Sequence, residues 1–434
     1  MGWRNRFLIA LAAAIGLVLI AALAVALLVN ANAFRGSIQA RVQQATGHPC
    51  ALRGPIKVSW FPWLALQTGA AELGNPSGFE GPPLARWRAA RIGARLFPLL
   101  RGALDIDRVR VEGLEARLIR DVDGQTNWRG IFDAPSRGAA GGPHFASLAG
   151  IELKDAAIEY LDRSTNRRIG VRALELTTGA FRADEPLAIE SRFELDAGES
   201  WPRFSGSLAT RLGLASDTVS LAGTRIDGSL SGPPFTAAGA PVHFAAALLQ
   251  LARPSMQLAV PSWALRLGEA QFYGSTGGIA WGDQVRLAGS LALAPTSLRA
   301  LLANFGVPIE PRRDATALET FSADLSYALD ANSLVAKPLA ILLDGTRLEG
   351  SATLAPLARG TIEFALHGAR MDLTRYLGSE RPGAKPFEFP TAALKKLRAR
   401  GDVTLDEARV TDLQMTKVRL RFLLQDGELR SERP

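Results

Sequence analysis

The stretch that decides the fold is LDIDRVRVEGLEARL, residues 104–118. Apolar and polar side chains alternate from Leu104 to Val111, and the alternation resumes from Leu114 to Leu118 after Glu112-Gly113. A period of two places the apolar side chains on one face of a strand and the polar side chains on the other. This stretch therefore predicts two strands, each with one apolar face.

The same alternation recurs from about residue 56 to the end of the chain. Successive runs are separated by turn signals such as Asp123-Gly124, Asp344-Gly345 and Asp426-Gly427, and Asp-Gly pairs tolerate the positive backbone angles of tight hairpins. We expect a mainly β protein, built as an elongated, curved antiparallel sheet with few short helices. One such helix is predicted over 297–304, capped by Thr296.

The N-terminus departs from this pattern. Residues 7–29 (FLIALAAAIGLVLIAALAVALLV) contain no charged side chain and no proline. As a helix rising about 1.5 Å per residue, they would be roughly 35 Å long, enough to cross a hydrocarbon core of about 30 Å. Arg4 and Arg6 precede this segment, so the positive-inside rule predicts that residues 1–6 form a cytoplasmic tail and that the rest of the chain is exported.

A cleaved signal peptide is the alternative, because Ala31-Asn32-Ala33 has the small-x-small form of a cleavage site. Signal-peptide apolar regions run about 7 to 15 residues, which is shorter than this segment, so an uncleaved anchor is favoured. Behind it, residues 30–47 predict a juxtamembrane amphipathic helix closed by Gly47. The glycine-rich joint at 138–143 then separates a β unit over 48–137 from β repeats over 144–434.

Composition argues against several classes of function. The formal net charge is +8, but the basic side chains are dispersed and form no stripe interleaved with aromatic residues, so no nucleic acid is expected as a partner. Cys50 is the single cysteine, which excludes an internal disulfide. The four histidines stand apart with no metal-ligand spacing, and no nucleophile elbow or phosphate loop occurs. We therefore expect no enzyme, no catalytic residues, no metal and no cofactor.

Several short sequence motifs, here called phrases, lie between Trp60 and Trp128. Together they identify a class of protein more specifically than any one of them does alone. They are FPWL (61–64), ELGNPSGF (72–79), LFPLL (96–100), DRVRVEGL (107–114) and RDVDGQTNW (120–128). In this order behind a lone N-terminal span, they closely resemble the N-terminal region of the AsmA family of Gram-negative envelope proteins. The residues that carry the resemblance, read as structural, are Phe61, Pro62, Trp63, Gly74, Asn75, Phe79, Pro98, Asp123, Gly124, Asn127 and Trp128.

The resemblance extends to later segments, including 344–354 and 397–429, and is weakest over about 181–280. In the family the last repeat runs on for several strands after the turn that matches Asp426-Gly427, so we expect a truncated or unusually short member. The resemblance implies an inner-membrane protein with its bulk in the periplasm. It further implies a taco-shaped β groove that carries phospholipid between inner and outer membrane or controls outer-membrane lipid balance, with membrane lipid and periplasmic or outer-membrane proteins as partners.

Alternation also predicts which residues share an apolar face with a role in such a groove: Leu104, Ile106, Leu114, Ala116 and Leu118. Parity does not distinguish a face that meets lipid from a face that meets a protein core. Two other classes of function remain open. A membrane-tethered assembly factor for outer-membrane proteins predicts a closed, side-chain-filled β core. A periplasmic hydrolase predicts a cleft with paired acids or a nucleophile and its base.

Overall fold

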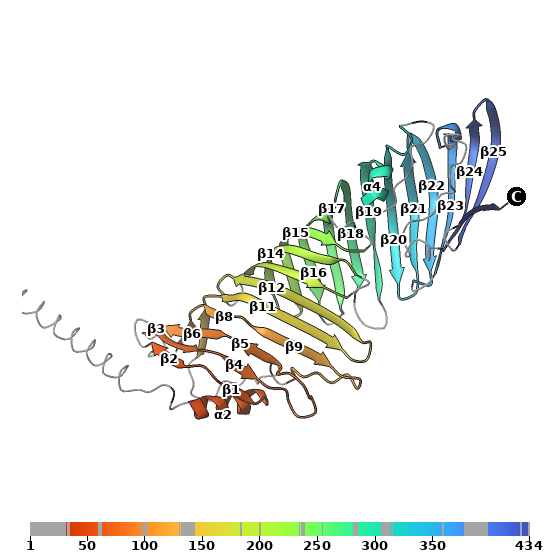
Figure 1. Ribbon diagram of the computed structural model, residues 1–434. Helices are drawn as coiled ribbons and strands as arrows, with labels where there is room; N and C mark the ends of the chain where they lie inside the picture. Colours follow the sequence, from red (N-terminus) through yellow and green to blue (C-terminus); the bar gives the residue numbers. More distant parts are fainter. Residues whose placement is uncertain are drawn as a thin grey trace, which may run out of the picture. The chain divides into compact units, whose positions relative to one another are not determined.

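Strands dominate the chain in the computed structural model (Figure 1). The structure describes residues 32, 35–59, 63–95, 97–98, 101, 103–129, 131, 144–182, 185–198, 201–233, 235, 239–253, 255–280, 285–304, 314, 316–357, 360–376, 398–425 and 428–432. It divides into two compact units, Met1–Glu199 and Ser200–Pro434. The predicted joint at 138–143 lies outside the described residues, so the predicted domain division stays a prediction.

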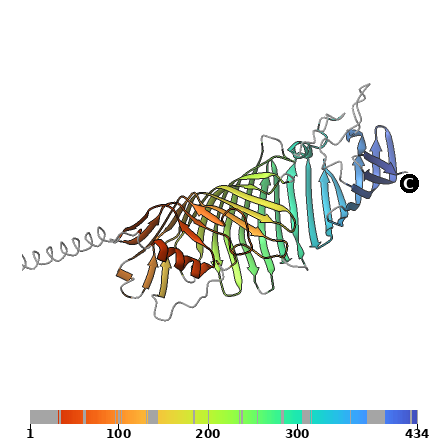
Figure 2. The same cartoon turned by 60° about the horizontal axis from the view of Figure 1, so that its bottom comes forward.

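In the described residues of unit 1, the long or regular elements are one helix and thirteen short or medium strands. They are α2 (Arg35–Thr46), β1 (Cys50–Leu52), β2 (Ile56–Ser59), β3 (Trp63–Thr68), β4 (Ala71–Leu73), β5 (Ala85–Trp87), β6 (Ala89–Arg95), β7 (Ala103–Ile106), β8 (Val109–Glu112), β9 (Glu115–Arg120), β10 (His144–Leu148), β11 (Ile151–Asp162), β12 (Arg167–Thr178) and β13 (Leu187–Asp196). Helix α2 lies inside the range predicted for the juxtamembrane helix. Its Ile38 packs against the buried side chains of Leu52, Ile56 and Ala71, so α2 covers the first strands of the sheet (Figure 2).

The strands of unit 1 form longer rows that are interrupted at matching points. Strands β1 and β2 together pair with β4 and β3, these pair with β5 and β6, and these in turn pair with β9 and β8. Gly54 and Gly69 lie at neighbouring interruptions, where a Cβ on Gly54 would sit 2.6 Å from the Gly69 Cα. Arg88, Gly113 and Asp155 continue this line of kinks, with positive φ at the last two. Because irregularities bend strands, aligned kinks bend the whole sheet.

The sheet is mixed, which corrects the purely antiparallel sheet expected from the sequence. In unit 1, β10 runs parallel to β7, and β11 runs parallel to β8 and β9. In unit 2, β23 and β24 are parallel. Tight hairpins such as the one at Asp344-Gly345 impose antiparallel pairing, whereas a parallel pair needs a longer connection, and both β9 to β10 and β23 to β24 are separated by more than twenty residues.

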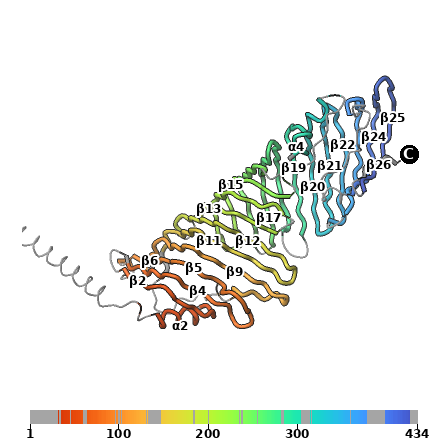
Figure 3. The backbone as a smooth tube through the Cα atoms, in the orientation of Figure 1, coloured from red at the N-terminus to blue at the C-terminus, as the bar shows by residue number. Residues whose placement is uncertain are grey.

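Unit 2 is a series of long strands that follow one another in chain order (Figure 3). The elements are β14 (Arg203–Leu214), β15 (Thr218–Ser231), β16 (Ala240–Ala252), β17 (Gln257–Leu267), β18 (Ala270–Ile279), β19 (Arg286–Thr296), α4 (Leu298–Asn304), β20 (Phe321–Asp330), β21 (Leu334–Leu343), β22 (Thr346–Ala355), β23 (Thr361–Asp372), η2 (Leu373–Tyr376), β24 (Arg398–Val410), β25 (Leu413–Gln425) and β26 (Glu428–Glu432). Register shifts interrupt several pairings near mid-strand, as between Leu325 and Tyr327.

Turns and helices follow the sequence signals closely. Asp344 and Gly345 have φ of 47° and 88° and join β21 to β22, which confirms the predicted tight hairpin at this pair. Helix α4 begins one residue later than predicted, because the cap is Ser297, whose Oγ accepts a hydrogen bond from the Ala300 N–H at 3.2 Å. In the part of the chain that the structure describes, no helix has the length and apolarity needed to span a membrane. The predicted span 7–29, with Arg4 and Arg6, lies outside that part.

Candidate functional site

One row of cross-strand neighbours runs without a polar residue over every strand from β14 to β25. Read from the pairing registers, its members are Leu208, Ile226, Phe244, Leu265, Phe272, Leu293, Ala323, Ile341, Leu348, Gly368, Leu405 and Val418. Neighbours of this kind share one face of the sheet, since directly paired residues project to the same side. Unit 2 therefore has one continuous apolar line across its strands.

Two further rows lie parallel to the first on the same face. One consists of Thr224, Ala246, Trp263, Gly274, Leu291, Leu325, Leu339, Gly350, Leu366, Val403 and Leu420. The other consists of Val219, Leu251, Leu258, Gly278, Leu287, Leu329, Leu334, Leu354, Ile362, Ala399 and Leu424. Thr224 is the single polar member, and its hydroxyl is paired with that of buried Thr210 at 2.9 Å. We call the surface formed by the three rows the apolar face.

Most large side chains of the apolar face are only half-buried. Phe244, Leu265, Leu291, Leu325 and Leu329 all keep part of their surface accessible. Side chains packed between two layers become almost fully buried, whereas side chains that touch only neighbours on their own sheet keep an open side. Among the described residues of unit 2, the strands pair side by side in one series, and no second sheet lies over this face.

One part of the apolar face is closed. Leu348, Met371, Leu405 and Ala408 are buried, with exposures of 1% at Leu405 and Ala408, and side chains of η2, including Leu373, pack against them. We call this cluster the covered corner.

A polar network fastens η2 to the loop that follows α4. Arg375 Nε donates to Asp314 at 2.8 Å and Arg375 Nη2 to the Thr316 hydroxyl at 2.9 Å, while the Tyr376 hydroxyl donates to Asp344 at 2.9 Å. Hydrogen bonds from the Thr316 hydroxyl and backbone, and then from Arg375, lower the pKa of Asp314 to about 2. Partial burial raises the pKa of Asp344, but hydrogen bonds from two backbone N–H groups and from Tyr376 outweigh it and leave this pKa below its usual value.

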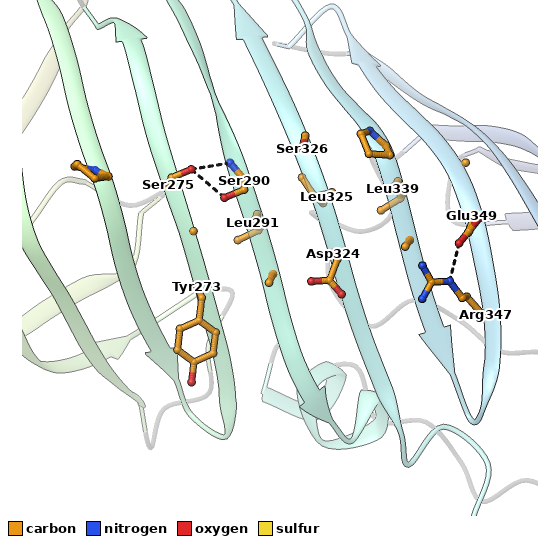
Figure 4. Close-up of a pocket in the computed structure, with 16 residues that line it drawn as sticks. Tyr273, Ser275, Ser290, Leu291, Asp324, Leu325, Ser326, Leu339, Arg347 and Glu349 are labelled. Carbon is orange, nitrogen blue, oxygen red and sulfur yellow. Dashed lines mark hydrogen bonds and ion pairs between the residues drawn. The ribbon is translucent and has the colours of Figure 1, made fainter.

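The opposite face of unit 2 is polar. It carries a shallow depression of about 710 Å³ in which Tyr273, Ser275, Ser290, Asp324 and Glu349 lie (Figure 4). Arg347 and Glu349 form an ion pair of 2.6 Å, and both remain largely exposed. Exposed charges and hydroxyls of this kind form a solvated surface.

Unit 1 has a shorter apolar row of the same kind. Its members are Cys50, Leu73, Ala85, Ala116, Ile158, Val171 and Leu195. Burial raises the pKa of the Cys50 thiol, as expected for a cysteine packed as a small apolar residue.

The structure places the residues that alternation singled out as lipid-facing. Ala116 belongs to this row, and Leu118 pairs with Tyr160 two residues further along. Ile106 pairs with Ala94 and Leu148. Leu114, just before β9, is half-buried, and the side chain of Leu104 is outside the described part. Whether these residues meet lipid stays a prediction.

Two of the sequence motifs of the N-terminal region meet in a buried hydrogen-bonded hub. Asn127 is fully buried: its Oδ1 accepts from the Ile119 N–H at 2.7 Å, and its Nδ2 donates to Asn75 Oδ1 and to the Arg117 carbonyl, both at 2.9 Å. Asn75 in turn donates to the Pro82 carbonyl. Two separate phrases of the sequence are thus joined by one amide, which explains why they occur together.

His48 completes the hub and was not singled out by the sequence. It is fully buried, and its ring nitrogens lie 3.0 Å from the Gly74 carbonyl oxygen and 3.1 Å from the Arg129 carbonyl oxygen. Gly74 is required here because a Cβ would sit 2.7 Å from Pro49 Cγ. A lone histidine carries no spacing signal, so only the fold reveals that it links the start of β1 to the turn after β9.

The remaining phrase residues lie in turns, in a short helical segment at Pro98 and at the start of β3. Gly124 has φ of 81° in the turn after Asp123, the Phe79 N–H donates to the Pro76 carbonyl, and the Pro98 carbonyl accepts from Arg101. The Trp128 ring lies 6.1 Å from that of Tyr160 between centroids. Trp63 pairs with Arg95 through the backbone, whereas Phe61 and Pro62 lie outside the described residues. Among the described residues, no group of three or more potential ligands could hold a metal ion.

These features define a class of protein: a long mixed β-sheet whose second unit has, among the described residues, a continuous apolar face on which most large side chains are half-buried. Residues 4–259, more than half of the chain, match the model of the AsmA family. The chain belongs to the AsmA family, as its phrases predicted, and this family is not generally one of enzymes. Comparisons with curated proteins and with solved structures gave no significant match.

Proposed function

We propose that the apolar face of unit 2 binds the acyl chains of phospholipids and that the protein moves phospholipid between the inner and outer membranes, or controls outer-membrane lipid balance. In this proposal the protein is anchored in the inner membrane by residues 7–29 and extends into the periplasm. The observation that carries the proposal is the row that is apolar on every strand from β14 to β25, together with the two rows beside it over β15 to β25, in which most large side chains are half-buried.

The energetic argument is simple. Apolar surface left in water costs about 25 cal/mol of free energy per Å². An exposed apolar face therefore destabilises the folded protein unless an apolar ligand or partner covers it. An acyl chain leaving a bilayer pays about 0.8 kcal/mol for each methylene that becomes exposed. The apolar face lowers this cost for the tails, while the lipid head group stays in water at the ends of the strands.

The length of the face indicates how lipid would occupy it. Strands lie about 4.8 Å apart, so β14 to β25 span on the order of 50 Å across the sheet. Half of a hydrocarbon core, the length of one leaflet's tails, is about 15 Å. Unit 2 therefore has room for several lipids one behind another, which favours a conduit over a carrier of a single lipid molecule.

Photo-crosslinking in living cells tests the proposal with matched positions on the two faces. A photo-reactive residue replaces Leu291 or Leu325 on the apolar face, and in the controls it replaces the adjacent Ser290 or Ser326 on the polar face. We expect mass spectrometry to find phospholipid adducts at the leucine positions and few at the serine positions. Equal labelling of both faces, or protein adducts alone at the leucines, would overturn lipid carriage and favour a tethered assembly factor.

A further inference from the structure

Three side chains from separate strands form a linear hydrogen-bonded relay on the same side of the sheet as the apolar face: Trp263 belongs to its second row, and Thr276 and Tyr327 lie between its second and third rows. Trp263 Nε1 donates to the Thr276 hydroxyl at 3.1 Å, the Thr276 and Tyr327 hydroxyls are 2.6 Å apart, and the Tyr327 hydroxyl donates to the Ser275 carbonyl at 3.2 Å. Each hydroxyl has a single hydrogen to donate, and in this chain of hydrogen bonds each hydroxyl accepts one bond and donates one. The relay therefore uses every polar hydrogen of its three side chains and leaves none for a ligand.

Glycines allow the two aromatic rings of the relay to lie close to the sheet. Gly274 is the register partner of Trp263, and Gly289 is the partner of Tyr327. A Cβ on Gly274 would sit 2.5 Å from Trp263 Cζ2, and one on Gly289 would sit 3.0 Å from the Tyr327 hydroxyl oxygen. Each aromatic side chain thus occupies the space above a glycine that any other residue would fill.

Among the residues that the structure describes, the relay also lies outside the covered corner. The side chains that pack against the covered corner come from β21 to β25 and η2, and neither Trp263 nor Tyr327 is among them. Both aromatic side chains are half-buried. Apolar residues lie beside the relay on the same side of the sheet: Val260 pairs with Thr276, and Leu291 pairs with Gly274 and with Leu325.

We propose that Trp263, Thr276 and Tyr327 form a fixed contact station for the hydrocarbon part of a lipid, an inference that rests on the proposed function. The hydrogen bonds of the relay hold the two rings in place, and the glycines allow the rings to lie close to the sheet. An acyl chain can then pass over the ring faces without obstruction. An aromatic platform for a sugar would need free donors and acceptors beside the rings. Here the polar atoms are paired with one another, so the station recognises methylene groups and not a head group.

Crosslinking at aromatic positions tests the station. Benzoylphenylalanine replaces Trp263 or Tyr327 in the full-length protein in cells, and in the control it replaces Tyr273, an exposed tyrosine on the polar face next to Gly274. We expect phospholipid adducts at Trp263 and Tyr327 that fragmentation places on an acyl chain, and at least tenfold fewer at Tyr273. Adducts on the head group, or equal yields at all three positions, would overturn the station.

The result is distinguishable from the test of the proposed function. Lipid adducts at Leu291 and Leu325 without adducts at Trp263 and Tyr327 would remove the station and leave lipid carriage intact. Absence of lipid adducts at all four positions would remove both.

Thr276→Val tests the relay separately from the rings, because valine keeps the shape of threonine and removes its hydroxyl. The Trp263 N–H then loses its acceptor within the apolar face, which favours entry of water. We expect the phospholipid that copurifies with the full-length protein to fall about three- to tenfold, whereas Ser290→Ala on the polar face leaves it unchanged. Equal lipid content in the two variants, with both folded by circular dichroism, would overturn the role of the relay.

Discussion

Leu405 and Leu325 are the same residue type on the same face of the same sheet, yet their surroundings differ. Leu405 in the covered corner is 1% exposed, because η2 and its neighbours pack over that region. Leu325 is half-buried, and it is not among the side chains of the covered corner or those packed against it. The difference shows that a row of apolar residues defines one face of the sheet but does not decide what covers that face. A helical turn makes one part of it protein core, and the rest remains available to a ligand.

Truncating these two leucines gives the largest expected effect. Leu405→Ala should lower the free energy of unfolding by about 2–5 kcal/mol, since it leaves a cavity in a closed cluster. Leu325→Ala should lower the free energy of unfolding by about 1–2 kcal/mol, because the half-buried side chain removes less apolar surface from water than a fully buried one. Urea unfolding of the full-length protein in detergent measures both. Equal losses would show that the uncovered part is packed as tightly as the corner.

The buried hub of unit 1 tests whether polar contacts can hold a region as firmly as the covered corner is held. Asn127→Ala leaves the Ile119 N–H and the Arg117 carbonyl without their buried partner, and we expect a loss of about 2–3 kcal/mol. Asp123→Ala, in an exposed turn nearby, is the control and should be close to neutral. If Asn127→Ala proved as mild as the control, the hub would not hold the N-terminal strands together.

Acid should loosen the network that fastens η2 to the covered corner. The Asp314 carboxyl has a pKa of about 2, below its ordinary value of 3.8. A lowered pKa in the folded state means that the carboxylate stabilises the fold above the ordinary value and that this contribution is lost as pH falls through about 2. Pepsin, which is active in this range, should cleave at Leu373 or Tyr376 faster in Asp314→Asn than in the unmodified protein at pH 4.5.

The same comparison at pH 2 supplies the control for this network. There the unmodified protein should approach the cleavage rate of Asp314→Asn, since protonation removes the same charge. A difference that persists unchanged from pH 4.5 to pH 2 would mean that Asp314 does not hold η2 through its carboxylate.

The polar face should give the smallest effect and so mark the baseline of the comparison. Arg347→Ala removes an ion pair whose partners are 69% and 61% exposed. Exposed pairs contribute between about 0.2 and 1 kcal/mol, so the unfolding midpoint should hardly move. A loss as large as that of Leu325→Ala would indicate that the depression beside Arg347 has an unrecognised structural role.

Much of this molecule could be predicted from local sequence. Alternation identified strands with unlike faces, and Asp344-Gly345 marked a hairpin, because side-chain parity and positive φ are properties of neighbouring residues. The direction of pairing could not be derived in the same way. β24 runs parallel to β23, and no local pattern encodes this direction, because alternation reads the same in a parallel and an antiparallel pair.

The buried hub was also beyond sequence reasoning in one respect. Asn75 and Asn127 were singled out as phrase residues, but His48 was not, since a lone histidine far from both phrases has no pattern. Its role arises only when β1, the turn at Gly74 and the turn at Arg129 meet.

By itself, the sequence determined that this protein is a β protein of the AsmA family, with apolar and polar faces assigned residue by residue. Those properties depend on side-chain periodicity and on short phrases, which are local. Only the tertiary structure decided that the strand registers align their apolar residues into continuous rows, that η2 covers one corner of them, and that Trp263, Thr276 and Tyr327 meet. Register and covering depend on contacts between residues far apart in the chain, and folding alone brings these together.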